Sequence, residues 1–387
     1  MRACMVAYTY YEEDNRVRRY AETLVENGWD VTVIALDNNA KNSPSYLKGV
    51  KIYRVQRRTI DEKTKLDYFF KIFTFFILSF LFLTRKSFIK KYDLIHVHSV
   101  PDFLVFSALI PKIFGTKVIL DIHDIVPELY CAKFKKTQTS MTFKILLAIE
   151  KLSAMFADHL IIANHIWGDR IVKRSVKTNK CSVILNYPDE TIFKRNCKTN
   201  PSSSSFTILY PGALSKHQGL DIAIKAVDLV RKSIPELKFE IYGSGTDESY
   251  LKNLVTMLSL DGIISFHDSV PLEIIASKMA EADLGIDPKL KDGFSNEAFS
   301  TKVLEFMMLG VPVIISNTSA HMRYIEPSTA KYFEAGDEKE LANCIRALYN
   351  DKALRESIIT QAEQFMQRMN WGKRKNEYLK IVNALIR

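Results

Sequence analysis

The sequence lacks the patterns that mark secreted, disulfide-rich and dinucleotide-binding proteins. Its five cysteines are scattered, with no Cys-x-x-Cys pair and no metal-ligand spacing, so we expect reduced thiols in the cytoplasm and no disulfide framework. Residues 1–7 lead straight into an expected strand and show no signal-peptide pattern, so we do not expect secretion. The segment after that strand, residues 8–19, has no Gly-x-Gly-x-x-Gly turn, which argues against an NAD or FAD enzyme.

What is present is a chain of 387 residues, 47% of them hydrophobic, which is enough for two domains with ordinary cores. Strands alternate with helices twice. They are expected near residues 3–8, 30–36, 50–54, 93–98, 117–122, 159–163 and 181–185, then near 206–210, 237–242, 263–266, 283–287, 312–316 and 331–333. Such alternation predicts an α/β protein with two doubly wound, Rossmann-like domains facing each other across a ligand-binding cleft. We expect the domains to cover residues 1–187 and 206–371, joined by a polar linker at 188–205.

The excess positive charge lies entirely in the N-terminal half. Of 54 basic and 44 acidic residues, 32 and 20 fall within residues 1–200, a net charge of +12, and the remaining 22 and 24 give −2. Eleven basic residues lie within residues 51–91 and flank an apolar run at 72–83. This run of about a dozen residues is short of the roughly 20 that cross a bilayer. We therefore expect it to lie on an anionic membrane surface, with a buried core helix as the alternative. No nucleic-acid motif accompanies the charge, so nucleic acid is not an expected partner.

Histidines stand near two expected strand ends of the first domain. His123 follows the strand at 117–122, where an imidazole can exchange a proton or bind a sugar hydroxyl, although a structural role is the alternative. His96 and His98 alternate along an earlier strand, and we expect one to face each way. His98, nearer the strand end, is the better site candidate. No carboxylate or cysteine is spaced to complete a metal site with this pair.

The first helix opens with polar and basic residues. Asp14 is a candidate for acceptor binding, with a plain N-cap role as the alternative. Arg16, at the helix start, can meet a phosphate of the acceptor. Arg18 and Arg19 are expected to be surface charges.

Two glycine-containing loops follow strands of the second domain. Gly212 and Lys216 lie after the strand at 206–210, where a lysine can neutralise a leaving diphosphate. Gly243 and Gly245 end the strand at 237–242, where glycines allow a close backbone approach to a nucleotide, or simply form a tight turn.

The most informative stretch runs from residue 296 to 314. Residues 301–309 show helical apolar spacing, Gly310 and a following proline end the helix, and a buried strand comes next. The helix start offers unpaired N–H groups and a positive dipole end, which suit a diphosphate. Glu305 lies about one turn further in and can accept hydrogen bonds from ribose hydroxyls, while Glu297 on the preceding loop can reach a sugar hydroxyl.

Together these segments resemble the retaining glycosyltransferases of family 4, which are group 1 glycosyltransferases with the GT-B architecture. The resemblance covers nearly the whole chain. It is carried by residues 14–21, 93–98, 121–124, 211–221, 242–245, 282–286, 297–314 and Trp371. Its most specific part is the Glu297/Glu305 pair followed by Gly310-Val311-Pro312-Val313.

The resemblance implies a division of roles between the two domains. Glu305 would hold the ribose, Glu297 would contact the donor sugar, and His123 would lie beside the transferred sugar. The C-terminal helix, about 372–387, would pack back on the first domain. The implied catalytic residues are His123, Glu297 and Lys216. The implied donor-binding residues are Gly212, Lys216, Gly243, Gly245, Phe299, Ser300, Thr301, Lys302 and Glu305. The acceptor-binding candidates are Asp14, Arg16 and His98.

The chain departs from the family at two positions. Members usually carry Arg at the position of Ala213 and Lys at that of Gln218, the two cations that balance the diphosphate. We expect Lys216 on the same loop to replace them, with help from Lys302 at the helix start.

The predicted reaction is transfer of a sugar from a nucleotide-diphosphate donor to a saccharide acceptor, lipid-linked by preference, with retention of configuration. No Asp-x-Asp follows a strand, so we expect neither a metal nor a cofactor. The predicted role is surface polysaccharide assembly on the cytoplasmic face of the membrane. Two alternatives stay open, a GT-B nucleotide-sugar epimerase and a non-catalytic, nucleotide-sugar-binding partner subunit.

Overall fold

The computed structural model describes residues 1–37, 44–57, 65–134, 136–195 and 205–387. The chain forms two compact units. The N-terminal unit comprises residues 1–186 together with 375–387, and the C-terminal unit comprises residues 187–374. Half of the expected linker, residues 196–204 with Cys197, lies outside the described residues.

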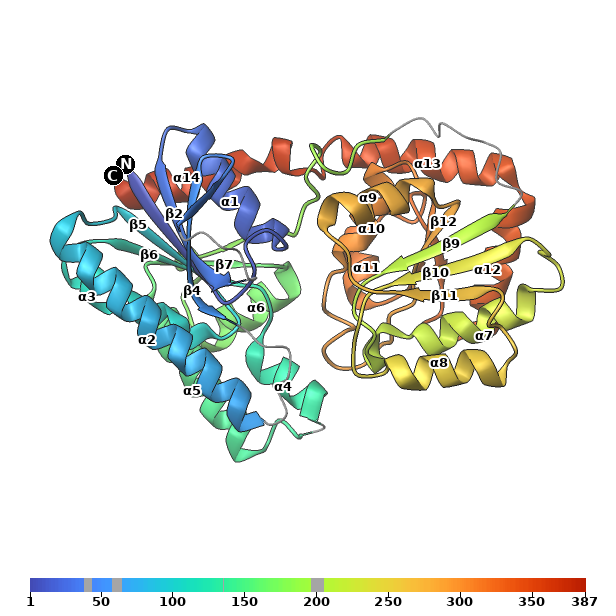
Figure 1. The fold of residues 1–387 in the computed structure, drawn as a ribbon, viewed down its shortest axis with the longest axis horizontal. Helices are drawn as coiled ribbons and strands as arrows, with labels where there is room; N and C mark the ends of the chain where they lie inside the picture. The colour runs from blue at the N-terminus through green and yellow to red at the C-terminus, as the bar shows by residue number, and fades with distance from the viewer. Residues whose placement is uncertain (38–43, 58–64, 135, 196–204) are drawn as a thin grey trace. The chain divides into compact units, whose positions relative to one another are not determined.

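The N-terminal unit is built on an eight-stranded sheet in the order β3-β4-β2-β1-β5-β6-β7-β8 (Figure 1). Its strands are β1 Arg2–Ala7, β2 Asp30–Asp37, β3 Ser45–Leu47, β4 Val50–Arg57, β5 Leu94–His98, β6 Lys117–Ile122, β7 His159–Ile162 and β8 Cys181–Val183. Neighbouring strands are parallel except for β3 and β4. The short antiparallel β3 was not predicted, because three residues leave no alternation to read.

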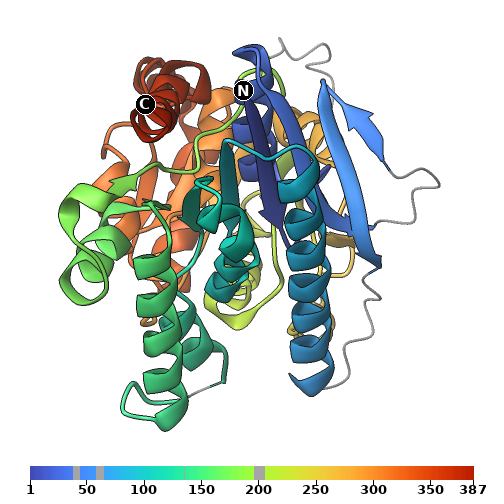
Figure 2. The same cartoon turned by 90° about the vertical axis from the view of Figure 1, so that its left-hand side faces the viewer.

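Helices join these strands. They are α1 Asn15–Glu26, α2 Lys65–Ile89, η1 Asp102–Ala108, α3 Leu109–Ile113, α4 Val126–Phe134, α5 Met141–Phe156, α6 His165–Arg174 and η2 Thr178–Lys180, with most of α14 Trp371–Ile386. The 3-10 helix η1 contacts both α2 and α5, and α2 also contacts α3 (Figure 2).

The α2 helix corrects our estimate of the apolar run. It is 25 residues long, and its segment Phe69–Ile89 is long and apolar enough to cross a membrane by length and composition. It nevertheless packs along one stripe, since Ile72, Phe75 and Leu83 are buried at helical spacing. The helix is therefore attached to the N-terminal unit along one side and apolar on its other sides as well.

The C-terminal unit is built on a six-stranded parallel sheet in the order β11-β10-β9-β12-β13-β14. The strands are β9 Phe206–Pro211, β10 Leu237–Tyr242, β11 Ile264–His267, β12 Leu284–Asp287, β13 Val313–Ser316 and β14 Lys331–Phe333. The connecting helices are η3 Lys216–Gln218, α7 Leu220–Val230, α8 Glu248–Met257, α9 Leu272–Glu281, α10 Thr301–Met308, α11 Ser319–Tyr324, α12 Glu338–Asn350 and α13 Lys352–Met366.

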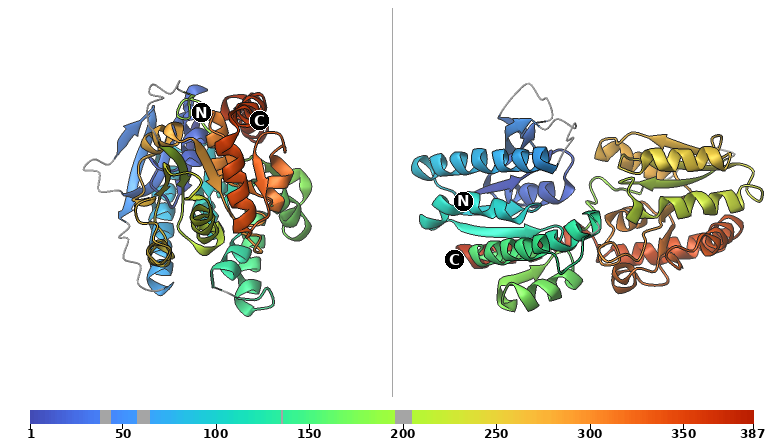
Figure 3. Two further views of the ribbon diagram at one scale, coloured as in Figure 1. Left: turned by 90° about the vertical axis from the view of Figure 1, so that its right-hand side faces the viewer. Right: turned by 90° about the horizontal axis from the view of Figure 1, so that it is seen from below.

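Helices form two contacting groups on this sheet. In one group α7 contacts α8 and α12, and in the other α10 contacts α9 and α13 (Figures 1 and 3). Side chains of α7 and α12 share one apolar core with the strands. The predicted α/β class with two doubly wound, Rossmann-like units is confirmed, and each of the thirteen predicted strands is present.

Candidate functional site

A cavity of about 460 Å³ lies in the C-terminal unit, where β9 and β10 end and α10 begins. Its walls come from the β9–α7 and β10–α8 loops, the β11–α9 connection, α9 and α10. The lining residues are Pro211, Gly212, Ala213, Tyr242, Gly243, Ser244, Ser269, Val270, Ile275, Met279, Thr301, Lys302 and Glu305. The carboxyl end of a parallel sheet is the expected position for a ligand site. Of the predicted donor-binding residues, the structure thus brings together Gly212, Gly243, Thr301, Lys302 and Glu305.

A glycine in β12 sets the position of α10. A β-carbon on Gly285 would lie 2.5 to 2.7 Å from ring atoms of Phe306, so only glycine lets this helix face settle against the sheet. Close seating of α10 directs the side chains of Thr301, Lys302 and Glu305 to the cavity. Burial raises the pKa of Glu305 to about 7, although nearby Lys302 opposes the shift. The carboxyl group therefore titrates close to neutral pH before any ligand arrives.

Lys302 is held from several sides. Its Nζ atom lies 3.2 Å from Asp287 Oδ1 and 4.5 Å from the centre of the Tyr210 ring. It also lies 3.4 Å from Gln218 Oε1. Burial alone would lower the pKa of Lys302, but Asp287 and Tyr210 raise it above its usual value. The ammonium group is therefore a fixed positive charge at the cavity wall.

Gly243 and Gly245 serve loop packing. A β-carbon on Gly243 would lie 1.9 Å from the carbonyl oxygen of Gly212, and one on Gly245 would lie 2.2 Å from that of Leu214. Backbone bonds tie the same loops together, since Gly212 N–H donates to Tyr242 O and Leu214 N–H donates to Ser244 O. Both glycines are therefore required by the close packing of the two loops, and their approach to a nucleotide stays a prediction. Gly243 still borders the cavity, whereas Gly245 does not line it.

Lys216 does not line this cavity. It lies in the 3-10 turn η3 and lines a separate cavity of about 400 Å³ beside α8, with Asp221, Asp247 and Tyr250. Two residues along the turn, Gln218 faces Lys302 instead. The prediction that Lys216 supplies the missing cation is therefore not supported by its position.

The loop before α10 places its predicted residues outside the cavity lining. Phe299 packs edge-on against Tyr324 with ring centres 5.0 Å apart, and Ser300 is the N-cap residue of α10. A hydrogen bond holds this loop in place, because the ammonium group of buried Lys289 donates to Ala298 O at 2.8 Å. Glu297 lies on the same loop and is half-buried.

A second polar cluster occupies the strand ends of the N-terminal unit. His98 on β5 pairs in register with Asp121 on β6. Asp121 is fully buried, and its Oδ2 atom lies 3.2 Å from His98 Nδ1 and 3.1 Å from His123 Nε2. The His123 side chain is 19% exposed and forms the part of this cluster nearest to solvent. Asp121 thereby fixes the orientation of the one predicted catalytic residue of this unit.

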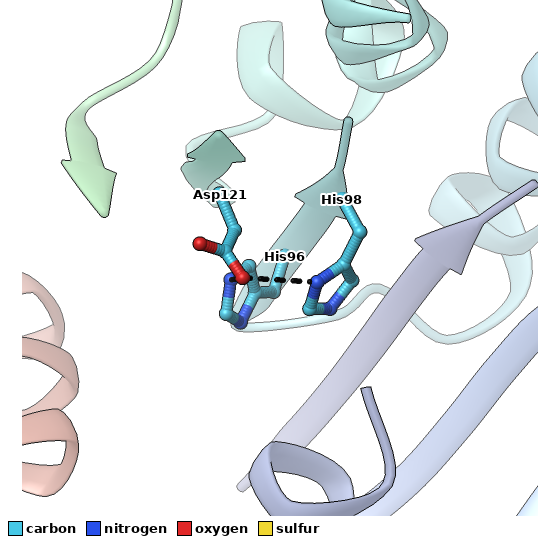
Figure 4. Close-up of side chains that lie close together, drawn as sticks. All are labelled: His96, His98 and Asp121. Carbon is cyan, nitrogen blue, oxygen red and sulfur yellow. Dashed lines mark hydrogen bonds and ion pairs between the residues drawn. The ribbon is translucent and has the colours of Figure 1, made fainter. Parts of the chain in front are cut away.

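His96 and His98 lie on the same side of β5, contrary to our expectation. Their rings stack with centres 4.3 Å apart, because residues i and i+2 of a strand share a face. Figure 4 shows both rings directed toward Asp121. Both histidines are buried, and burial lowers the pKa of each, so both are neutral near pH 7. His98 is therefore a buried support beneath His123 and does not present itself to an acceptor.

Arg16 is also internal, which corrects its predicted contact with an acceptor phosphate. Its guanidinium group forms a bidentate pair with Asp121, with both N–O distances 2.7 Å, and donates to Ile184 O and Asn186 Oδ1. Its side chain is only 4% exposed. Burial opposes ionisation of Asp121, but Arg16 and His123 beside it hold the pKa of that carboxyl well below its usual range. Arg16 and Asp121 are thus a buried, matched charge pair.

Two further arginines of this helix also differ from expectation, whereas Asp14 takes the N-cap role that was its alternative. Arg18 and Arg19 are buried rather than surface charges, and Arg19 donates to Leu185 O and Asn186 Oδ1. Asp14 accepts a hydrogen bond from Val17 N–H at 3.0 Å, which is the N-cap geometry. An acceptor-binding role for Asp14 stays a prediction.

His96, His98 and Asp121 are close enough together to be considered as metal ligands. One potential ligand atom of each lies within 4.8 Å of the others. Arg16, however, already binds both oxygens of Asp121, and a divalent cation would have to displace or adjoin that guanidinium group. The donor set therefore does not fit a metal ion well, and the metal-free reaction stays a prediction.

Comparison with known proteins gives the family. Residues 193–365 match the family described as "Glycosyl transferases group 1", and residues 14–186 match the "Glycosyl transferase 4-like domain". The chain is a group 1 glycosyltransferase with the GT-B fold. The predicted family membership is confirmed, and with it the glycosyltransferase class of activity.

Relatives of this glycosyltransferase act in several pathways. The phosphatidylinositol N-acetylglucosaminyltransferase gpi3 subunit of Schizosaccharomyces pombe is 23% identical, over 92% of this chain and 74% of that protein. The capsular polysaccharide biosynthesis glycosyltransferase CapM of Staphylococcus aureus is 26% identical, over 72% of this chain and 75% of CapM.

Two solved structures share the fold over nearly the whole length of both chains. Sucrose-phosphate synthase from Thermosynechococcus elongatus superimposes with a TM-score of 0.78 at 17% identity, covering 100% of this chain and 99% of that one. Anabaena Alr3699/HepE in complex with UDP and glucose gives 0.75 at 17% identity, covering 99% of each chain.

Sequence reasoning missed two buried carboxylates of this glycosyltransferase. Asp121 and Asp287 each lie at the end of a central strand and each bind a cation that the sequence did mark, Arg16 or Lys302. An aspartate that ends an otherwise apolar strand was the available signal, because such a side chain enters the sheet edge and requires a partner.

Proposed function

We propose that this glycosyltransferase moves a sugar from a nucleoside-diphosphate donor to a lipid-linked saccharide acceptor, with retention of configuration, during assembly of a surface polysaccharide. The single observation that carries the donor half is the cavity at the start of α10, where a fixed ammonium group and a carboxyl group lie together. A diphosphate suits the cation and the helix N-terminus, and a ribose suits Glu305. The complex of the structural neighbour HepE with UDP supports a uridine nucleotide as the first donor to test.

The proposed chemistry follows the movement of charge. Cleavage of the bond between the sugar C1 and the diphosphate oxygen leaves negative charge on the diphosphate and positive character on the sugar. Lys302 and the first N–H groups of α10 would stabilise the departing diphosphate, because they are fixed before the reaction begins. We assign Glu305 to the nucleoside and expect the acceptor hydroxyl to attack on the face that the diphosphate leaves. No metal is needed in this scheme.

Two further residues receive roles in this scheme. His123, oriented by Asp121 and partly exposed, would hydrogen-bond the transferred sugar or accept a proton. Glu297 would contact a hydroxyl of the donor sugar. Both roles come from the family resemblance.

The donor half is tested by calorimetry with UDP, GDP and ADP and by transfer assays with the matching nucleotide sugars. We expect Glu305→Ala to abolish nucleoside diphosphate binding, and Glu297→Ala to spare it but to stop transfer. Equal loss of binding in both variants would contradict this division of roles. The anomeric configuration of the product is read by NMR, and an inverted product would refute retention. Incubation with the nucleotide sugar alone distinguishes transfer from epimerisation.

The lipid half is supported by exposed apolar side chains of the N-terminal unit. They lie on α2, α3 and α5, which η1 holds together. The residues, each more than a third exposed, are Phe69, Phe70, Phe73, Ile77, Leu81, Phe88 and Ile89 of α2, Leu109 and Ile113 of α3, and Met141, Ile145, Leu152 and Met155 of α5. We call this set the apolar helix face. Exposed apolar groups of this number are typical of a surface that water does not normally contact.

The charges near the apolar helix face favour a membrane as its partner. Exposed basic residues on or beside these helices are Arg85, Lys90, Lys91, Lys117, Lys144 and Lys151. Each basic residue near an anionic leaflet contributes about 1 kcal/mol to binding. We therefore propose peripheral binding to the cytoplasmic face of a cell membrane, where a lipid-linked acceptor is available. The role of CapM in capsular polysaccharide biosynthesis is consistent with such an acceptor.

Flotation with phosphatidylglycerol and phosphatidylcholine vesicles tests this surface. We expect binding to the anionic vesicles, and at least a tenfold loss of binding in Phe70→Asp/Phe73→Asp. Met257→Asp changes an apolar side chain of the C-terminal unit that is more exposed than Phe70 or Phe73, and it serves as the control. Unchanged binding of the double variant would contradict the proposal.

A further inference from the structure

The positive charge of the donor cavity comes from an unexpected element. Among the residues that line the cavity, Lys302 on α10 is the basic one. The β9–α7 loop, which usually carries cations in this family, contributes Gly212 and Ala213 to the lining and no charge. Lys216, the lysine on that loop, lines the other cavity.

The side chain of Lys302 extends to the β9–α7 loop. A β-carbon placed on Gly212 would lie 3.3 Å from Lys302 Nζ, and Gln218 Oε1 lies 3.4 Å from the same atom. The ammonium group therefore lies beside Gln218 and beside Gly212, the residue before Ala213, and Ala213 and Gln218 are the two loop positions where the family carries its cations.

The neighbouring side chains keep this ammonium group in place. Asp287 is fully buried and lies 3.2 Å from Lys302 Nζ through one oxygen, while its other oxygen lies 3.1 Å from His321 Nε2. The other ring nitrogen of His321 lies 2.7 Å from Ser316 O. An ion pair anchored in this way fixes a charge before a ligand binds, which lowers the cost of reorganisation.

We propose that Lys302 is the diphosphate-binding cation of this enzyme, supplied by α10 in place of the two cations of the β9–α7 loop. This inference rests on the proposed function, because it names the residue that holds the leaving group of the donor. It also explains the two departures from the family. A lysine at position 218 would place a second ammonium group beside Lys302 Nζ, so Gln218, which accepts a hydrogen bond, is compatible with Lys302 where lysine is not.

Paired binding measurements with UDP and uridine test the proposal. Lys302→Met removes the cation at similar side-chain volume. We expect UDP affinity to fall roughly 10- to 100-fold, because a charge-assisted hydrogen bond is lost, and uridine affinity to change less than about threefold. Lys302→Met leaves Asp287 buried without its cation, so Lys302→Met/Asp287→Asn is measured as well, with circular dichroism to confirm folding.

A transplant of the family arrangement gives the sharper result. Ala213→Arg/Gln218→Lys, added to Lys302→Met/Asp287→Asn, should recover at least tenfold in UDP affinity. The same two substitutions in the unmodified chain should give less than a threefold gain, because the new ammonium group and Lys302 repel each other. Lys252→Met, on the exposed side of α8, is the matched lysine control.

The outcomes separate the two proposals. If the unmodified chain binds none of UDP, GDP and ADP, the proposed function fails and this inference falls with it. If UDP binds but folded Lys302→Met/Asp287→Asn binds it equally well, or if Lys216→Met reproduces the loss, the proposed function stands and the assignment of Lys302 is overturned.

Discussion

At the carboxyl ends of its strands, the N-terminal sheet carries a cluster of paired side chains around buried Asp121, whereas the C-terminal sheet borders a cavity of about 460 Å³. In the N-terminal unit, both oxygens of Asp121 are bound by Arg16, and burial lowers the pKa of His96 and of His98 beside them. In the C-terminal unit, Lys302 borders open space although it is also paired. The same architecture thus produces one edge where a buried ion pair supports a single partly exposed histidine, His123, and another where a paired lysine borders a cavity.

The largest effect is expected where the charges are most deeply buried. Asp121→Ala leaves the guanidinium group of Arg16 buried without a counter-charge and should lower the free energy of unfolding by about 3–5 kcal/mol. Urea denaturation measures the loss. Arg16→Met/Asp121→Leu removes both charges and should recover much of the stability. If the double variant is as unstable as Asp121→Ala, the loss of stability does not come from the unpaired charge of Arg16.

A smaller but still large loss is expected from the loops of the C-terminal cavity. Gly243→Ala forces a β-carbon to within 1.9 Å of Gly212 O, so the two loops must separate and the free energy of unfolding should fall by more than about 2 kcal/mol. Gly262→Ala meets no atom within 4 Å and is the matched control. Equal thermal unfolding curves for the two variants would show that separating the two loops does not lower the stability, which would contradict this prediction.

Glu305 should give a pH-dependent effect of up to about 3 kcal/mol, the stability equivalent of a pKa raised from 4.5 to about 7. Burial raises its pKa to about 7, so the folded state retains a proton that the unfolded state releases nearer pH 4.5. Stability should therefore decrease as pH rises from about 4.5 to 7, and Glu305→Gln should be more stable than the unmodified chain at pH 8 but not at pH 4.5. Thermal unfolding at both pH values measures the difference.

The same titration should appear in ligand binding. The ionised carboxylate is the better acceptor for ribose hydroxyls, so uridine affinity should rise as pH increases through about 7. Glu305→Gln should bind uridine more weakly and without this pH dependence. Uridine is chosen because it has no phosphate that titrates in this range. A parallel pH profile in both proteins would assign the titration to another group.

The smallest effect is expected at Asp14. Asp14→Ala removes the N-cap of α1 and should lower the free energy of unfolding by about 1 kcal/mol. Asp14→Ser keeps a capping oxygen and should retain most of that stability. Urea denaturation measures both. If both variants keep their stability but raise the KM for an acceptor, Asp14 belongs to the binding site after all.

The sequence predicted the sheet content well and the side-chain partners poorly. Apolar runs such as Val313–Ser316 depend on local composition, so their strands could be assigned in advance. The burial of Arg16 depends on its ion pair with Asp121, which lies 105 positions away in the chain. No local sequence pattern links the two residues. Lys216 and Lys302 were both named, but the turn at η3 that separates their cavities depends on backbone geometry.

The course of the chain has a consequence for how the protein is made. Tyr378, near the C-terminus, is fully buried in the N-terminal unit, where its hydroxyl group lies 3.1 Å from His96 Nδ1. Residues 375–387, which are translated after the C-terminal unit, therefore complete a core begun by residues 1–186. A ribosome that has released only residues 1–186 holds an incomplete unit, and a fragment cut there should expose the histidine cluster and aggregate.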